Sequence, residues 1–193
     1  AIDQVLAAVD DGLSLRAAYT DVVLPVLQEV GRGWLVGEVS IGEEHFATAT
    51  TEALLARLQE RAPARPQKNL VVVGAALENN DHDIGLRIVM DFFDMDGWRP
   101  VFLGAGMPTA DLAQALIDFE ANLLALTVTL APQLETAKQL IAFLRHHEET
   151  KSIKVLVGGS AFRSSPELLK EVGADALAED PEQAVKIGNQ LLR

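Results

Sequence analysis

The sequence predicts an α/β protein built in two parts, a helical bundle followed by a parallel sheet with helices on both faces. Three observations lead to this prediction. Residues 1–62 show only helical periodicity, residues 63–68 contain two prolines and no apolar period, and from residue 69 short apolar runs alternate with amphipathic stretches. We therefore expect a helical domain at 1–62, a linker at 63–68 and an α/β domain at 69–193.

The first part should contain two main helices. Pro25 lies inside the pattern of the first helix and should bend it, and Gly31, Gly33 and Gly37 should loosen its end. The apolar positions of this helix are Val22, Val23, Val26, Leu27, Val30 and Trp34. After a break at 40–42, a second helix is expected from Glu43 to Arg61. Its apolar face should consist of Phe46, Ala53, Leu54 and Leu58.

The second part should alternate strands with helices. The expected strands are Leu70–Val73, Pro100–Leu103, Leu123–Thr129, Ile153–Val157 and Asp175–Ala178. The expected helices cover residues 84–96, 109–121, 134–148, 166–172 and 181–192. Apolar strands that alternate with amphipathic helices are typical of a parallel sheet covered on both faces, and five strands predict a flavodoxin-like, doubly wound sheet. A ligand should then bind at the carboxyl ends of the strands.

Composition narrows the function further. The 193-residue chain is 49% hydrophobic, enough for a real core, and its formal net charge of −12 argues against direct binding of nucleic acid. The chain has no cysteine, which excludes disulfides, thiolate metal ligands and a thioether-linked chromophore, and fits a cytoplasmic protein. No apolar run reaches the roughly 18 residues of a membrane span, so no membrane association is predicted.

The loop after the first strand carries the main candidate site. His82 is the only histidine of the second part on a loop that follows a strand, and imidazole is a versatile metal ligand. Asn80 and Asp81 are close enough in sequence to accept a hydrogen bond from the other ring nitrogen. Gly85, at the start of the next helix, would allow a bulky ligand to approach the backbone.

The spacing of three elements gives this loop a specific meaning. Asn80-Asp-His82-Asp-Ile-Gly85 is followed, after 41 intervening residues (86–126), by Thr127-Val-Thr129. Another 28 residues (130–157) lead to Gly158-Gly159. This pattern resembles the motif of the cobalamin-binding domain family, Asp-x-His-x-x-Gly followed by Ser-x-Leu and Gly-Gly at comparable intervals.

The resemblance implies a role for each position. His82 would be the lower axial ligand of cobalt in place of the cofactor's own dimethylbenzimidazole, and Gly158 and Gly159 would leave room for the displaced nucleotide tail. Thr127 would supply the hydroxyl of the family's serine. Two positions depart from the pattern. Asn80 replaces the aspartate that holds the histidine ring, so its amide oxygen should accept from the ring without adding charge, and Thr129 replaces the leucine, which should make the pocket more polar.

The helical part adds a second resemblance. Nine residues separate Trp34 from Glu44-His45. This spacing is similar to that in the light-sensing region of CarH-type adenosylcobalamin photoreceptors. The resemblance implies that Trp34 covers the adenosyl group and that Glu44 and His45 make polar contacts there. The best-known relatives carry a histidine directly after the tryptophan, where this chain has Leu35, so capture of cobalt by that residue after photolysis is not available.

The leading hypothesis is a sensor that binds adenosylcobalamin and responds to its photolysis, and is not an enzyme. The resemblance further implies a homo-oligomer, with a separate effector domain or regulatory partner for any effect on transcription. The alternative is the corrinoid carrier, loaded with methylcobalamin, of a methyltransferase system. A receiver or nucleotide-binding domain of similar fold would leave the His82 spacing unexplained. Some relatives also hold a bilin, which could bind here only without a covalent bond because cysteine is absent.

Overall fold

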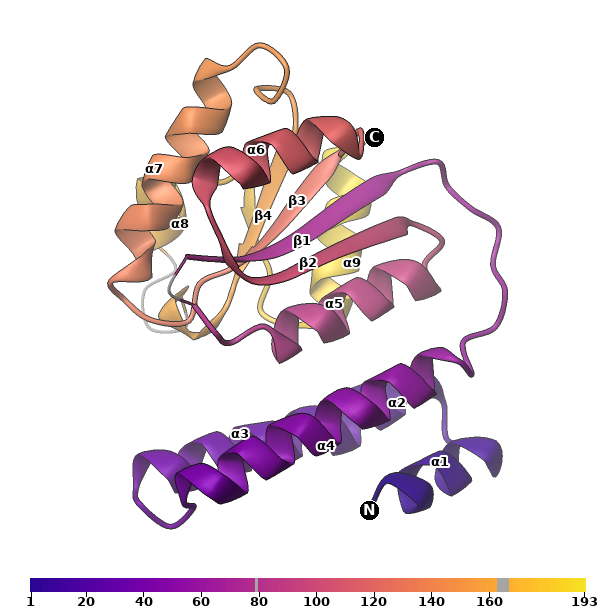
Figure 1. Cartoon of the computed structure of the whole chain (residues 1–193). Coiled ribbons are helices and arrows are strands. Elements are labelled where there is room, and N and C mark those ends of the chain that lie inside the picture. Colours follow the sequence, from indigo (N-terminus) through magenta and orange to yellow (C-terminus); the bar gives the residue numbers. More distant parts are fainter. Residues whose placement is uncertain (79, 163–166) are drawn as a thin grey trace. The chain divides into compact units, whose positions relative to one another are not determined.

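A computed structural model describes residues 1–78, 80–162 and 167–193 of the chain. It consists of two compact units, residues 1–64 and residues 65–193 (Figure 1). The division falls in an exposed segment without regular structure that contains the expected linker. No helix among the described residues is both long enough and apolar enough to cross a membrane.

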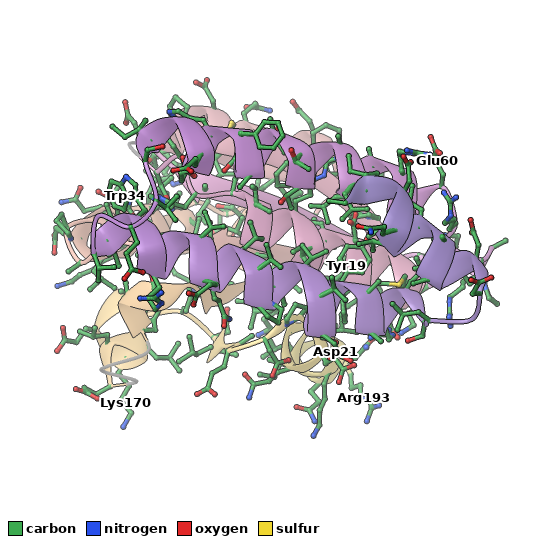
Figure 2. All side chains as sticks on the ribbon, turned by 90° about the horizontal axis from the view of Figure 1, so that it is seen from below. Tyr19, Asp21, Trp34, Glu60, Lys170 and Arg193 are labelled. Atoms are coloured by element: carbon green, nitrogen blue, oxygen red, sulfur yellow. The ribbon has the colours of Figure 1, made fainter. Side chains whose placement is uncertain are left out.

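The first unit is all-helical. Its elements are α1 (Ile2–Asp10), α2 (Leu15–Ala17), a π-helix η1 (Ala18–Val23), α3 (Leu24–Leu35) and α4 (Ile41–Gln59). Figure 2 shows Tyr19 between the long helices, where it is only 1% exposed. Arg61 donates hydrogen bonds to Asp10, at 2.8 and 3.1 Å, which tie the end of α4 to α1 and lower the pKa of the Asp10 carboxyl group.

The region around Pro25 is irregular in a way that the proline explains. Pro25 has no N–H to donate along the helix. The turn before it is a π-helix, with α2, η1 and α3 following one another without a break. As expected, Pro25 does not end the helical run, and the helix type changes in the turn before it. Gly31 and Gly33 lie within α3, which continues to Leu35. Gly33 is buried, and the side chain of Val39 occupies the space that a side chain at position 33 would need.

The apolar face expected for the second long helix was partly wrong. The helix begins at Ile41, with Ser40 as its N-cap, so residues 41 and 42 are helical rather than a break. Phe46 is 74% exposed, and Ala53 is exposed as well. The residues of α4 that are buried lie along a different stripe, at Thr51, Leu54, Leu55 and Leu58. On α3, Val26 and Trp34 are about half exposed, at 52% and 49%.

The second unit is a five-stranded parallel sheet with order β2-β1-β3-β4-β5. The strands are β1 (Val71–Leu77), β2 (Arg99–Met107), β3 (Leu123–Thr127), β4 (Lys154–Gly158) and β5 (Ala176–Leu177). The helices are α5 (Ile84–Met95), α6 (Thr109–Asp118), α7 (Gln133–His146), a 3₁₀ turn η2 (Ser160–Phe162), α8 (Leu168–Val172) and α9 (Pro181–Leu191). A helix was predicted at 166–172, and residue 166 lies outside the described residues.

This arrangement confirms the predicted fold class. The strand order is that of a flavodoxin-like sheet. Helices α5 and α9 cover one face, and α6, α7 and α8 cover the other (Figure 1). On the second face a continuous core joins Leu116 of α6, Leu140 of α7 and Val172 of α8 to the strands. All seven residues of β1 are buried, as expected for a central strand between two helical layers.

Two strands are longer than the sequence indicated. β1 continues to Leu77 through Gly74-Ala-Ala, and β2 continues to Met107 through Gly104-Ala-Gly106. These small residues gave little apolar signal. The pairing of β1 with β2 is irregular after Gly74, where Ala75 aligns with Gly104 and Leu77 with Met107. The extra length carries the end of β1 directly to the loop that contains His82.

Candidate functional site

The candidate site lies at the carboxyl edge of the sheet. Ala76 of β1 pairs with Thr127 of β3, and Thr127 pairs with Gly158 of β4, so the three predicted motif segments leave neighbouring strands at the same level. The chain leaves β1 toward β2 at one side of the sheet and leaves β3 toward β4 at the other side, so the two connections diverge between β1 and β3. Such a switch point is where open α/β sheets bind ligands.

His82 stands in the loop between β1 and α5. It is exposed, as is its neighbour Asp81, so a ligand can reach the imidazole from solvent. Its backbone N–H donates to Oδ1 of Asn80 over 3.1 Å. The loop is thus held through the backbone of His82, while the residue itself is exposed.

Asn80 differs from its expected role. Its side chain is completely buried, and its amide oxygen accepts from the backbone of His82 where an interaction with the ring was expected. Its amide nitrogen donates to the carbonyl oxygen of Thr127 over 3.1 Å. Asn80 therefore joins the loop after β1 to the last residue of β3, across the switch point.

Gly85 is the second residue of α5 and is exposed. A Cβ atom added there meets no other atom within 4 Å, so packing within the chain does not require glycine at this position. Close approach of a ligand to the backbone would be a reason for glycine at this position.

Replacing Gly85 by leucine should therefore leave the apoprotein as stable as the parent but weaken cobalamin binding at least about tenfold, because the new side chain would fill space that is open after the His82 loop. Isothermal titration with hydroxocobalamin, together with urea unfolding of the apoprotein, measures both effects. A matched Gly31→Leu change on α3, which also meets open space, is the control for a general effect of an exposed leucine. Unchanged binding by the Gly85 variant would remove this glycine from the site.

The segment after β3 is shaped by a residue that the sequence did not single out. Gln133, at the start of α7, is buried, and its Oε1 accepts the backbone N–H groups of Thr129 and Leu130, both at 3.0 Å. Ser160 donates its hydroxyl to the carbonyl oxygen of Thr129 over 2.8 Å. These contacts explain why β3 ends at Thr127 rather than at Thr129, as was expected. Thr127 and Thr129 are both partly exposed.

Different backbone contacts restrict side chains at Gly158 and at Gly159. A Cβ on Gly159 would lie 2.2 Å from the carbonyl oxygen of Val128, and its φ of +108° is one that side chains disfavour. A Cβ on Gly158 would lie 3.1 Å from the carbonyl oxygen of Ala178. Close packing of the strand ends thus requires Gly159, in addition to the room for a ligand tail expected from the sequence.

A pocket of about 330 Å³ opens beside these glycines. It is lined by Gly159, Phe162, Leu177, Ala178 and Glu179. It lies beyond the ends of β4 and β5, with one wall from the 3₁₀ turn after β4. Sequence analysis missed all of these except Gly159. The rule that ligands bind beyond strand ends could have indicated residues 177–179, because a strand had been predicted at Asp175–Ala178.

In the helical unit the predicted residues gather around the turn between α3 and α4. Trp34 is at the end of α3 and half-exposed, and Glu44 and His45 are in the first turns of α4 (Figure 2 labels Trp34). Glu44 and His45 are partners: Nδ1 of His45 lies 3.3 Å from Oε2 of Glu44, whose other oxygen accepts from Thr48. Ser40 hydrogen-bonds Glu43 through its backbone N–H and hydroxyl, which lowers the pKa of Glu43 and caps α4.

Comparison with known protein families identifies the class. Residues 70–186 match the B12 binding domain, and residues 1–59 match a second B12 binding domain family. The first match covers more than half of the chain, so the chain belongs to the B12 binding domain family. The expectation of a cobalamin-binding module rather than an enzyme is thereby confirmed at the level of the family.

Similar proteins fall into two groups. The chain is 26% identical to corrinoid protein DSY3155 of Desulfitobacterium hafniense over 96% of this chain and 87% of that one. It is 28% identical to the HTH-type transcriptional repressor CarH of Myxococcus xanthus over 84% of this chain but 52% of the repressor. A structure of the Methanosarcina barkeri monomethylamine corrinoid protein has the same fold, with a TM-score of 0.84, 20% identity, and coverage of 98% of this chain and 88% of the other.

The residues present fit a cobalt corrinoid. An exposed histidine lies in the loop at the switch point, the helix start next to it has open space at Gly85, and a pocket is lined in part by Gly159. When bound, the corrinoid supplies a cobalt ion with an exchangeable upper ligand.

Proposed function

We propose that this chain is a corrinoid carrier protein, which holds cobalamin for methyl transfer between partner enzymes. The observation that carries the proposal is the similarity to corrinoid proteins along both units, spanning 96% of this chain and 87% of its relative. The motif spacing in the sequence favoured a sensor, whereas the relatives favour the corrinoid carrier.

In this proposal each unit has a task. His82 would hold the cobalt, and the pocket beside Gly159 would receive the nucleotide tail. The segment at 63–68 is exposed and without regular structure, as a linker between the two units would be. Its far end is anchored, because Lys68 bonds Asn189 on α9 over 3.0 Å and pairs with Asp96.

A second function has its own observation in favour. Trp34, Glu44 and His45 have the spacing of light-sensing adenosylcobalamin proteins, with Trp34 near the end of α3 and the other two near the start of α4. In a sensor, Trp34 would cover the adenosyl group. Loss of the adenosyl group in light would then change the position of the helical unit or the self-association of the protein. Leu35, which is 77% exposed, offers no imidazole to capture the cobalt afterwards.

One experiment separates the two functions. The chain is titrated in the dark with methylcobalamin and with adenosylcobalamin, in the parent and in a Trp34→Ala variant. A carrier should bind the methyl form at least as tightly as the adenosyl form, with little effect of Trp34→Ala on their ratio. Preference for adenosylcobalamin by tenfold or more, lost in Trp34→Ala, together with a light-dependent change of size in chromatography, would contradict the carrier and support the sensor.

A further inference from the structure

The side chain of Asn80 links the loop after β1 to the end of β3 across the switch point, and we call this pair of hydrogen bonds the latch. The side chain is 0% exposed, and both of its polar ends contact backbone atoms of segments far apart in the sequence. The nitrogen donates to the carbonyl oxygen of Thr127, and the oxygen accepts from the N–H of His82, each over 3.1 Å. The backbone N–H of Asn80 also closes a turn onto Leu77.

The chemistry of these partners fixes the orientation of the amide. A carbonyl oxygen can only accept, so the group facing Thr127 has to be a donor, and a backbone N–H can only donate, so the group facing His82 has to be an acceptor. An asparagine amide provides one of each. An ionised carboxylate provides acceptors only, and would place a negative oxygen against the carbonyl oxygen of Thr127.

We propose that Asn80 is a positioning residue, whose neutral amide fixes the His82 loop to the end of β3 and so presents the imidazole to cobalt. This inference rests on the proposed ligation by His82, and concerns how the chain orders that ligand. It gives the departure from the family's aspartate a physical reason. In this chain the side chain bonds the backbone N–H of the histidine and the carbonyl oxygen of Thr127, and a carboxylate cannot donate to that oxygen.

The test compares Asn80→Asp and Asn80→Ala with the parent. Each protein is produced with ¹⁵N-labelled histidine and loaded with cob(II)alamin, and electron paramagnetic resonance reports the axial nitrogen. Splitting by ¹⁵N shows histidine ligation, whereas splitting by ¹⁴N shows that the cofactor's own base is bound. Affinity is measured by titration with hydroxocobalamin. We expect both variants to bind at least about tenfold more weakly and to lose the ¹⁵N splitting in most molecules, with Asn80→Asp the more affected.

A matched control lies at the opposite edge of the same two strands. Oδ1 of Asn122 accepts the backbone N–H of Val71 over 2.8 Å, so this amide acts as an acceptor. Asn122→Asp keeps an acceptor in place and should retain the affinity within about twofold and the full ¹⁵N splitting. The same chemical change is thus expected to be harmless where an acceptor is needed and harmful where a donor is needed.

The outcomes separate the two levels of the argument. If the parent itself shows no ¹⁵N splitting, ligation by His82 is wrong and the proposed function with it. If the parent shows it and Asn80→Asp binds as tightly with the same splitting, the latch is wrong while ligation stands. Should Asn80→Asp fail to fold, Asn80→Ala decides, because parent-like affinity and splitting in that variant overturn the proposal.

Discussion

Replacing His82 by alanine is expected to abolish ligation of cobalt by the protein and to lower the affinity for cobalamin more than about a hundredfold. Loss of residues that only support a metal ligand costs 10–100-fold in affinity, so loss of the ligand itself should cost more. His82 is exposed and makes its described hydrogen bond through the backbone, which alanine keeps. The apoprotein should therefore fold as the parent does.

The measurement is titration with hydroxocobalamin, with the resonance spectrum of the cob(II)alamin form as the reporter of the axial ligand. His146→Ala is a suitable control, since His146 is an exposed histidine of the same unit at the end of α7, with its Nδ1 against the carbonyl oxygen of Ala142. Binding by His82→Ala that equals binding by the control in affinity and in spectrum would show that cobalt is held elsewhere.

Replacing Gly159 by alanine is expected to lower the free energy of unfolding of the α/β unit by about 2–4 kcal/mol. The new Cβ would lie 2.2 Å from the carbonyl oxygen of Val128, an approach that backbone atoms cannot avoid without moving. The φ of +108° adds strain for any residue with a side chain. Since Gly159 also lines the pocket, weaker cobalamin binding should follow.

Urea unfolding followed by the fluorescence of Trp98 reports this unit, because Trp98 is fully buried within it. A Trp34→Phe background removes the other tryptophan of the chain. Gly85→Ala provides the contrast, as its Cβ meets open space and should not lower stability. Equal stability of the two alanine variants would mean that the end of β4 is freer to adjust than its packing against Val128 indicates.

Local sequence determined most of the architecture. Apolar runs that alternate with amphipathic stretches predicted the parallel sheet, because strands buried on both faces need continuous apolar sequence and the connecting helices need one apolar side. The spacing of His82, Thr127 and Gly158 predicted that the three segments belong to one site. The structure brings them to adjacent strand ends, since the carboxyl ends of parallel strands meet at the same edge of the sheet.

The tertiary structure alone decided what individual residues do at that edge. Asn80 and Thr127 are 47 positions apart, and only the pairing of β1 with β3 puts the amide against that carbonyl group. Gly159 meets the backbone of Val128 because β3 pairs with β4. The exposure of Phe46 on α4 likewise depends on which side of the helix faces its neighbours. A sequence states which groups can donate, accept or pack, whereas the register of strands and the rotation of helices select the partner each group meets.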